Sequence, residues 1–243
     1  MAAEPSKRRS AEDVLPKGAE NMLAALLDGL ERHGRPMRPL VRVVLVGNQH
    51  EKPGKWEKQR EPLLHWLSAY VKELSGEKEL TGLLLGLPSG WILLAEGLHE
   101  PVAAMLKALS AEEGQLFDVA KVIHQSEDIP CRAFSSWGSK CVSVARKNYA
   151  ETAGDQLATM LGELVIGMIK IGQAVGPMGS HDLNKIDAWQ AHFPEMPSNE
   201  RVGQAIEHDD VPTLKDFLDI FETPVEISLQ SDRVWPPERP MVY

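Results

Sequence analysis

The segment from Gly47 to Lys55 has residue types that could bind a phosphate. It reads GNQHEKPGK and follows an apolar run. A phosphate-binding loop has four residues between its glycines and a Ser or Thr directly after its lysine, because that hydroxyl binds magnesium. Here six residues separate Gly47 from Gly54, and Trp56 stands where the hydroxyl belongs. The spacing therefore predicts a solvated loop rather than a nucleotide site.

A second glycine pattern consists of Gly172, Gly176 and Gly179. A dinucleotide-binding glycine motif follows a strand, whereas these glycines follow a predicted helix. We interpret them as residues that end this helix.

The spacing of the histidines and cysteines matches no metal-binding motif. None of the eight histidines forms an i, i+4 pair with an acid beside it, which is the zinc pattern of a helix. Cys131 and Cys141 are ten positions apart and form no CxxC motif, so we expect two reduced thiols. No serine lies in a G-x-S-x-G elbow. These patterns predict no catalytic residues, metal or cofactor.

The composition narrows the class of protein. The chain has 243 residues, 43% of them hydrophobic and 25% charged, which is enough for an ordinary buried core. A net charge of −9 argues against a nucleic-acid binder or a protein held on anionic lipid. The apolar window from Leu80 to Leu98 is interrupted by Pro88, Gly90 and Glu96, and the N-terminus lacks the apolar core of a signal peptide. We therefore expect a cytoplasmic or cytoskeletal protein without a membrane-spanning segment.

The elements that would position any site begin after a polar tail. Residues 1–17 predict a disordered tail, and 18–39 predict an N-terminal helix and linker, because leucines recur there at helical spacing. Within a domain over 40–146, the expected elements are strand 41–46, a helix from 61, strands 80–87 and 91–95, a helix from 100, and strands 118–124 and 140–144. Pro62 fits the first helical position, and Pro88-Ser89-Gly90 fits a hairpin turn. This β-α-β-β-α-β-β order predicts an α+β, ferredoxin-like sandwich with both helices on one face of the sheet.

The remaining residues, 147–243, predict a mainly helical extension. Helices are expected over 152–175, over 201–208 after a start at Pro197-Ser198-Asn199-Glu200, and from Pro212 to Phe221, with a final strand over 224–229. The apolar face of the first of these helices needs cover, so we expect the extension to pack on the core. The prolines of the tail Trp235-Pro236-Pro237 keep it extended, and we expect its tryptophan either to pack back on this core or to insert into a partner.

Three segments together resemble the BLUF domain, a blue-light sensor that uses flavin. They are LTGLLL at 80–85, WILLAEG at 91–97 and RAFSSW at 132–137. The resemblance covers about Val41 to Val144 and has the same order of elements. It implies a flavin site between the two helices that cover the sheet.

The photochemical residues of the BLUF domain are absent. Its tyrosine and glutamine correspond to Leu45 and Leu93, its asparagine corresponds to Ser75, and its methionine corresponds to Ser139. Of the residues around the flavin in the BLUF domain, this sequence retains only the tryptophan, which is Trp137. A leucine can neither transfer a proton nor bond the polar edge of a flavin, so we expect no bound flavin.

The C-terminal half is similar to the testis-expressed protein 47 family, on FETPVEISL at 221–229 and Val234-Trp235-Pro236. That similarity implies a non-enzymatic component of the motile-cilium axoneme, with the central apparatus as the favoured place. Its partners would be other axonemal proteins, and neither nucleic acid nor membrane. Because aromatic anchors dominate interfaces, Trp235, Pro236 and Pro237 are the candidate partner-binding residues.

Two other functions stay open at this point. One is a flavin-binding blue-light sensor, which visible absorption of the purified protein would reveal. The other is a small-molecule enzyme on a ferredoxin-like fold, which would need a polar cluster in a cleft.

Overall fold

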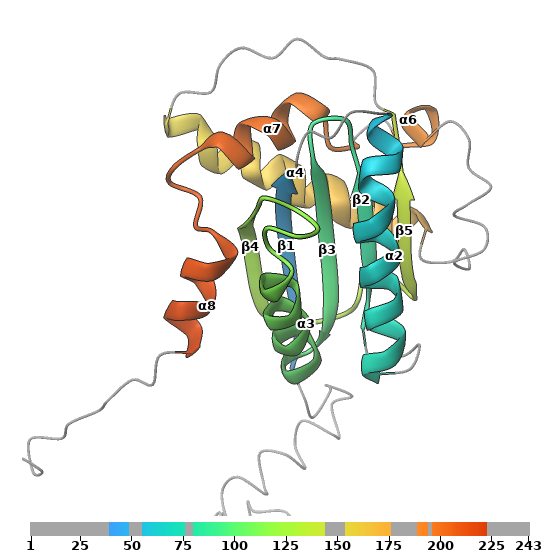
Figure 1. The fold of residues 1–243 in the computed structure, drawn as a ribbon, viewed down its shortest axis with the longest axis vertical. Coiled ribbons are helices and arrows are strands. Elements are labelled where there is room, and N and C mark those ends of the chain that lie inside the picture. The colour runs from blue at the N-terminus through green and yellow to red at the C-terminus, as the bar shows by residue number, and fades with distance from the viewer. Residues whose placement is uncertain are drawn as a thin grey trace, which may run out of the picture.

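The computed structural model describes residues 39–48, 55–75, 80–143, 154–175, 189–193 and 196–222. Figure 1 shows a sheet with helices on both faces. The elements are β1 (Leu40–Asn48), α2 (Trp56–Ser75), β2 (Thr81–Gly86), β3 (Trp91–Leu98), α3 (His99–Ala111), β4 (Val119–Ile129), β5 (Trp137–Cys141), α4 (Gly154–Val175), α6 (Trp189–His192), α7 (Asn199–Glu207) and α8 (Leu214–Glu222).

The sheet has five strands in the order β4-β1-β3-β2-β5. β3 pairs antiparallel with both β1 and β2, and β1 pairs antiparallel with β4. Each helical crossover, β1-α2-β2 and β3-α3-β4, therefore joins two parallel strands with one strand between them. This is the ferredoxin-like arrangement, so the predicted α+β fold and its order of elements are confirmed.

The hairpin between β2 and β3 forms where its turn residues predict it. The N–H of Leu87 donates to the carbonyl of Gly90 at 2.8 Å, which closes the turn. A Cβ atom on Gly90 would lie 2.4 Å from the carbonyl oxygen of Gly47, so only glycine fits here. The predicted turn is confirmed, and the glycine also lets two backbone segments approach closely.

Alternating residues of each strand face two different helical layers. In β1, Val43 and Leu45 join the core beneath α2 and α3. Val44 and Val46 join the core formed with α4, α6 and α7 on the opposite face. Figure 1 shows α2 and α3 in front of the sheet and α4 behind it. Both sheet faces are therefore covered, which explains why the strands contain continuous apolar runs.

Helix α4 is unusually apolar for its length. By length and composition, Leu157–Val175 could cross a membrane, although it contains Glu163 and Lys170; the sequence analysis considered only the window from Leu80 to Leu98. A core helix passes the same test, and Met160, Leu164 and Met168 are buried in the core. Gly172 lies inside this helix, which continues to Val175, and a Cβ at Gly172 would lie 2.6 Å from the ring of Phe134. Close packing explains this glycine, and the interpretation that it ends the helix was wrong.

Helix α2 begins six residues earlier than its proline suggests. Trp56 is its first residue, so Pro62 lies inside the helix, where it removes one backbone hydrogen bond. The buried side chain of Arg60 explains the extra turn, since it donates to the carbonyls of Leu87 at 3.2 Å and Pro88 at 3.1 Å. Tertiary hydrogen bonds therefore hold a turn that local propensity disfavours.

The helices of the second half begin at side-chain caps. Ser198 accepts the N–H of Arg201 at 3.2 Å, which confirms the predicted start of α7. At α8 the cap is Thr213, which accepts the N–H of Asp216 at 3.1 Å, so Pro212 precedes the helix instead of starting it. Sequence analysis overlooked this cap because a proline stands beside it.

The segment between α7 and α8 runs along the outer edge of β4. The N–H of Val122 donates to the carbonyl of Pro212 at 3.0 Å, and Lys121 bridges to Thr213. Lys121 Nζ also donates to the carbonyl of His208 at 2.6 Å. β4 extends beyond the predicted strand to Ile129, and Asp128 has a positive φ of 54° near its end. Residues 1–38 and 223–243 lie outside the described residues, as do the tail, helix and final strand predicted there.

Candidate functional site

Leu45 and Leu93 are direct cross-strand partners on β1 and β3. Both side chains are fully buried in the core beneath α2 and α3. The BLUF resemblance places the photochemical tyrosine and glutamine at these two positions. The structure thus brings the two positions together as that resemblance implies, but it fills them with aliphatic groups that neither donate nor accept protons.

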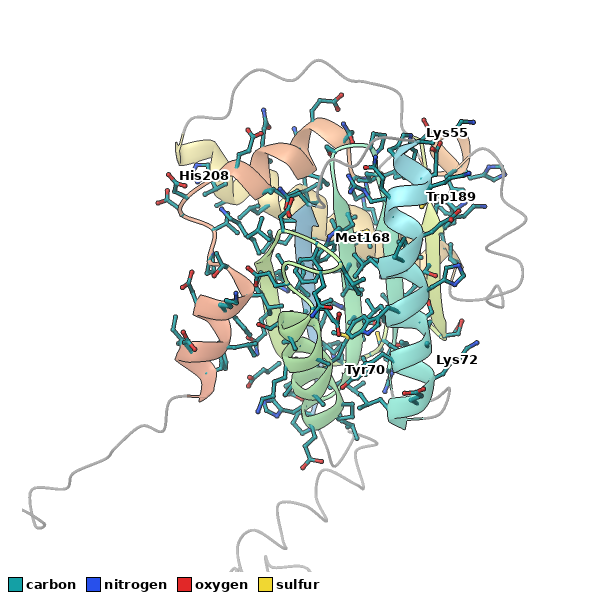
Figure 2. The ribbon with its side chains drawn as sticks, in the orientation of Figure 1. Lys55, Tyr70, Lys72, Met168, Trp189 and His208 are labelled. Carbon is teal, nitrogen blue, oxygen red and sulfur yellow. The ribbon has the colours of Figure 1, made fainter. Side chains whose placement is uncertain are left out.

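The two helices above this pair are bonded to each other. Tyr70 of α2 donates its hydroxyl proton to the carbonyl of Ala104 in α3 at 3.2 Å, and Figure 2 shows Tyr70 between these helices. The ring of Trp66 stacks on Tyr70 with centroids 5.4 Å apart. The Tyr70 hydrogen bond therefore joins α2 to α3 where the resemblance would place a flavin ring, and the Trp66–Tyr70 stack lies beside it within α2.

Trp137 and Ser139 lie together on β5, facing α2. The indole Nε1 of Trp137 donates to Oγ of Ser68 at 3.3 Å. The hydroxyls of Ser68 and Ser139 are 3.0 Å apart, within hydrogen-bond distance. Sequence analysis did not select Ser68, although a partly buried indole needs an acceptor. Ser75 is the last residue of α2, and its side chain is not among those that the structure describes.

The carboxylate of Glu96 is 0% exposed and accepts three hydrogen bonds. Its Oε1 accepts Nε of Arg42 at 2.6 Å. Its Oε2 accepts the backbone N–H groups of Ala133 at 2.8 Å and Phe134 at 3.1 Å. The Glu-Gly end of β3 and the R-x-F-x-x-W segment are therefore one hydrogen-bonded unit.

Arg132 connects this unit to the start of β2. Its Nη1 donates to Oγ1 of Thr81 at 3.1 Å and to the carbonyl of Glu96 at 3.2 Å. Gly82, next to Thr81, has a φ of 153°, and a Cβ there would lie 2.1 Å from the carbonyl oxygen of Leu94. All three segments that resemble the BLUF domain thus meet through backbone and side-chain contacts that hold the strands together.

The thiol of Cys141 is poorly suited to nucleophilic chemistry. Burial, and then the nearby carboxylates of Glu61 and Glu57, raise its pKa to about 11 against a smaller opposing effect of Arg60. The thiolate is the reactive form, so this cysteine is inert near neutral pH. Burial in turn lowers the pKa of the Arg60 guanidinium. Within the described ranges, no group of three His, Cys, Asp or Glu is arranged to hold a metal ion.

His124 lies in the middle of β4. Burial lowers its pKa, and the positive charge of Arg42 lowers it further. The lowered pKa favours the neutral imidazole near Arg42, where a second positive charge would be unfavourable.

The sequence model of one family, testis-expressed protein 47, matches residues 39–223. The chain belongs to the testis-expressed protein 47 family. Comparison of this chain with curated proteins finds no match.

Solved structures similar to this chain include three with BLUF or light-regulated descriptions. A bacterial light-regulated adenylyl cyclase is 17% identical with a TM-score of 0.35, over 61% of this chain and 39% of that one. The BLUF domain of BlrP1 is 14% identical with a TM-score of 0.35, over 62% and 88% of the two chains. BlsA in its photo-activated state is 14% identical with a TM-score of 0.36, over 60% and 90%. The match thus spans well under half the length of the cyclase.

The testis-expressed protein 47 match begins at Pro39 and ends at Thr223, so it takes in every element of the described fold. The candidate partner-binding residues Trp235, Pro236 and Pro237 lie beyond that match and outside the described residues. Within the matched region, Leu45 and Leu93 form a buried pair, and Trp137 and Ser139 form a hydrogen-bonded group with Ser68. The side chain of Ser75 is not among those described.

Proposed function

We propose that this member of the testis-expressed protein 47 family is a non-enzymatic structural component of the motile-cilium axoneme. The central apparatus is its favoured place. Its BLUF-like, ferredoxin-like fold would serve as a scaffold that binds other axonemal proteins, in the cytoskeleton rather than in a membrane or on nucleic acid. The family name supports this proposal because the testis builds sperm flagella.

The pairing of Leu45 with Leu93 is the observation that carries the proposal. A flavin sensor needs groups at these positions that exchange protons and hydrogen bonds with the cofactor, and two leucines have none. The same pair disfavours the sensor alternative. What the fold retains is a sheet with helices packed on both faces, which suits a protein that positions other proteins.

The hydrogen bonds of the charged residues in the BLUF-like segments also support a scaffold role. Glu96 and Arg132 are the charged residues of the BLUF-like segments. Glu96 accepts backbone N–H groups of the β4–β5 connection, and Arg132 donates to a backbone carbonyl of β3. A small-molecule enzyme would instead direct such groups into a cleft to meet a substrate. Their structural use disfavours the enzyme alternative at this position.

Extraction of the tagged full-length chain from isolated sperm or cilia tests this proposal. We expect the protein to stay with the axoneme when detergent removes the membrane and to leave only in rising salt, together with its partners. Release of all the protein by detergent alone would contradict an axonemal role. A tagged soluble protein of similar size, expressed in the same cells, serves as the control for trapping.

The tail provides a finer test of how the scaffold binds its partners. Replacing Trp235 by Ala should weaken rebinding to extracted axonemes by about 2 kcal/mol, as for a hot-spot aromatic, and leave the melting temperature unchanged. Tyr243→Ala, a second aromatic change in the same tail but without flanking prolines, should leave rebinding as it is. Equal rebinding by both variants would remove Trp235 as an anchor without affecting the axonemal proposal.

A further inference from the structure

Two hollows lie side by side where the chain enters β1. The smaller, of about 350 Å³, is lined by Pro39, Leu98, His99 and Glu100. The larger, of about 390 Å³, lies between α3 and α8, and His99 lines it as well. We call the two together the α3–α8 groove, whose floor and walls include Val41, Val102, Leu106, Phe217, Leu218 and Phe221. The groove therefore runs from the first described residue of the chain to the last turn of α8.

One wall of this groove has large apolar side chains that the described residues do not cover. Phe221 is 54% exposed, and its ring stacks on Phe217 with centroids 4.4 Å apart. Ile220, which precedes Phe221 in α8 but lines neither hollow, is 72% exposed. Figure 1 shows α8 beside β4, with its last turn leading away from the sheet. An apolar groove rimmed by such residues is the kind of surface that binds an amphipathic helix.

The chain itself contains such a helix-forming segment, a few residues before Pro39 in the sequence. Gly18 to His33 lies outside the described residues, and its sequence places Leu23, Leu26, Leu27 and Leu30 on one helical face. A helix of this length is marginally stable alone in water, so its leucine face needs a surface to bury.

The linker is short enough to keep that segment at the groove. Five residues, 34–38, separate His33 from Pro39, and they can span at most about 18 Å. A short tether raises the effective concentration of the segment at a nearby surface to the millimolar range, so a weak intrinsic affinity suffices. Pro39 lines the groove, so the tether is attached at the groove's own end.

We propose that Gly18–His33 binds in the α3–α8 groove as an amphipathic helix, with its four leucines against α3 and α8. This inference is independent of any role in the axoneme. The segment after α8 is a less suitable occupant, because residues 224–229 alternate apolar and polar with the period of a strand. A third helix fits between two helices better than such a strand does.

Hydrogen exchange of the full-length protein tests the proposal. We expect amides of residues 23–33 to exchange at least about tenfold more slowly than a random coil, because docking protects them. Leu27→Glu should abolish that protection and also speed exchange in the last turn of α8. Asn21→Glu adds the same charge on the opposite helical face, so it should preserve protection at both places.

The groove side is tested by a reciprocal variant. Phe221→Glu changes an exposed residue, so the fold should persist, and the amides of 23–33 should lose their protection. Coil-like exchange of 23–33 in the unaltered protein would overturn the proposal. So would protection that rises with protein concentration, which means a second copy occupies the groove. Protection that survives both Leu27→Glu and Phe221→Glu would likewise overturn it.

Discussion

Nε of Arg42 donates to Oε1 of Glu96 at 2.6 Å, and the two residues stand directly opposite each other on β1 and β3. Glu96 is fully buried, whereas the Arg42 side chain is 13% exposed. The other carboxylate oxygen holds two backbone N–H groups of the β4–β5 connection. One acidic side chain thus couples two central strands to the loop that leads into β5.

Glu96→Ala should strongly destabilise the fold. It leaves the Arg42 charge and two N–H groups without their acceptor, and removing one partner of a buried pair costs about 3–5 kcal/mol. The free energy of unfolding from a denaturant titration measures the loss. Glu207→Ala, at an exposed position, should change stability by less than about 0.5 kcal/mol. Equal stability of the two variants would show that the carboxylate has no structural role.

Two glycines of α4 should respond in opposite directions to alanine. Gly172→Ala places a methyl group against Phe134 and Ala133 and should cost about 1–3 kcal/mol. A methyl group added at Gly162 would have no neighbouring atom within 4 Å, so Gly162→Ala should stabilise the helix by about 0.5–1 kcal/mol. Thermal melting of both variants decides this point. If Gly172→Ala were stabilising as well, α4 would not pack closely on the 133–134 loop.

The two cysteines should differ in their reaction with an alkylating reagent. Cys131 is exposed and should react readily in the native protein. Cys141, with its pKa raised to about 11, should resist until the pH approaches that value. The raised pKa also links the stability of the fold to pH. The stabilisation that comes from keeping the Cys141 thiol protonated is fully present below the pKa of this thiol in the unfolded chain. It is lost as the pH rises towards 11. Mass spectrometry after alkylation at several pH values, with denatured protein as the control, measures both sites. Rapid native labelling of Cys141 near neutral pH would contradict the burial of this thiol.

Purified protein should be colourless and should take up neither FMN nor FAD. The Leu45–Leu93 pair offers no polar contact, and Tyr70 joins α2 to α3. A titration followed by flavin fluorescence and visible absorption checks this, with a flavin-binding BLUF protein run in parallel. A stoichiometric flavin spectrum that shifts on illumination would remove the scaffold proposal.

Much of the fold follows from short-range patterns that need no tertiary information. The turn at 88–90 and the Ser198 cap are local hydrogen-bonding signals, so they were predictable from the residues alone. The burial of Val102, Met105, Leu106 and Leu109 follows in the same way from their spacing on α3. In these places local preference and global packing agree.

The discrepancies occur where distant residues decide the outcome. The first turn of α2 depends on Arg60 reaching the hairpin carbonyls, and Gly172 depends on the approach of Phe134. Neither contact leaves a mark in the local sequence. The same applies to the candidate site: the leucine pair was predictable from the resemblance, but the acceptors of Trp137 and Arg42 were not. Ser68 and Glu96 become partners only when the sheet and helices assemble.

The pairing of residues 208–213 with the edge of β4 has a consequence for how the chain folds during synthesis. Lys121 and the carbonyl it contacts at His208 are 87 positions apart, so all five strands leave the ribosome well before this edge receives its cover. During that interval the β4 edge is open to pairing with other chains. The nascent protein should therefore depend on chaperones, and it should be most prone to aggregate when translation stops between α4 and α7.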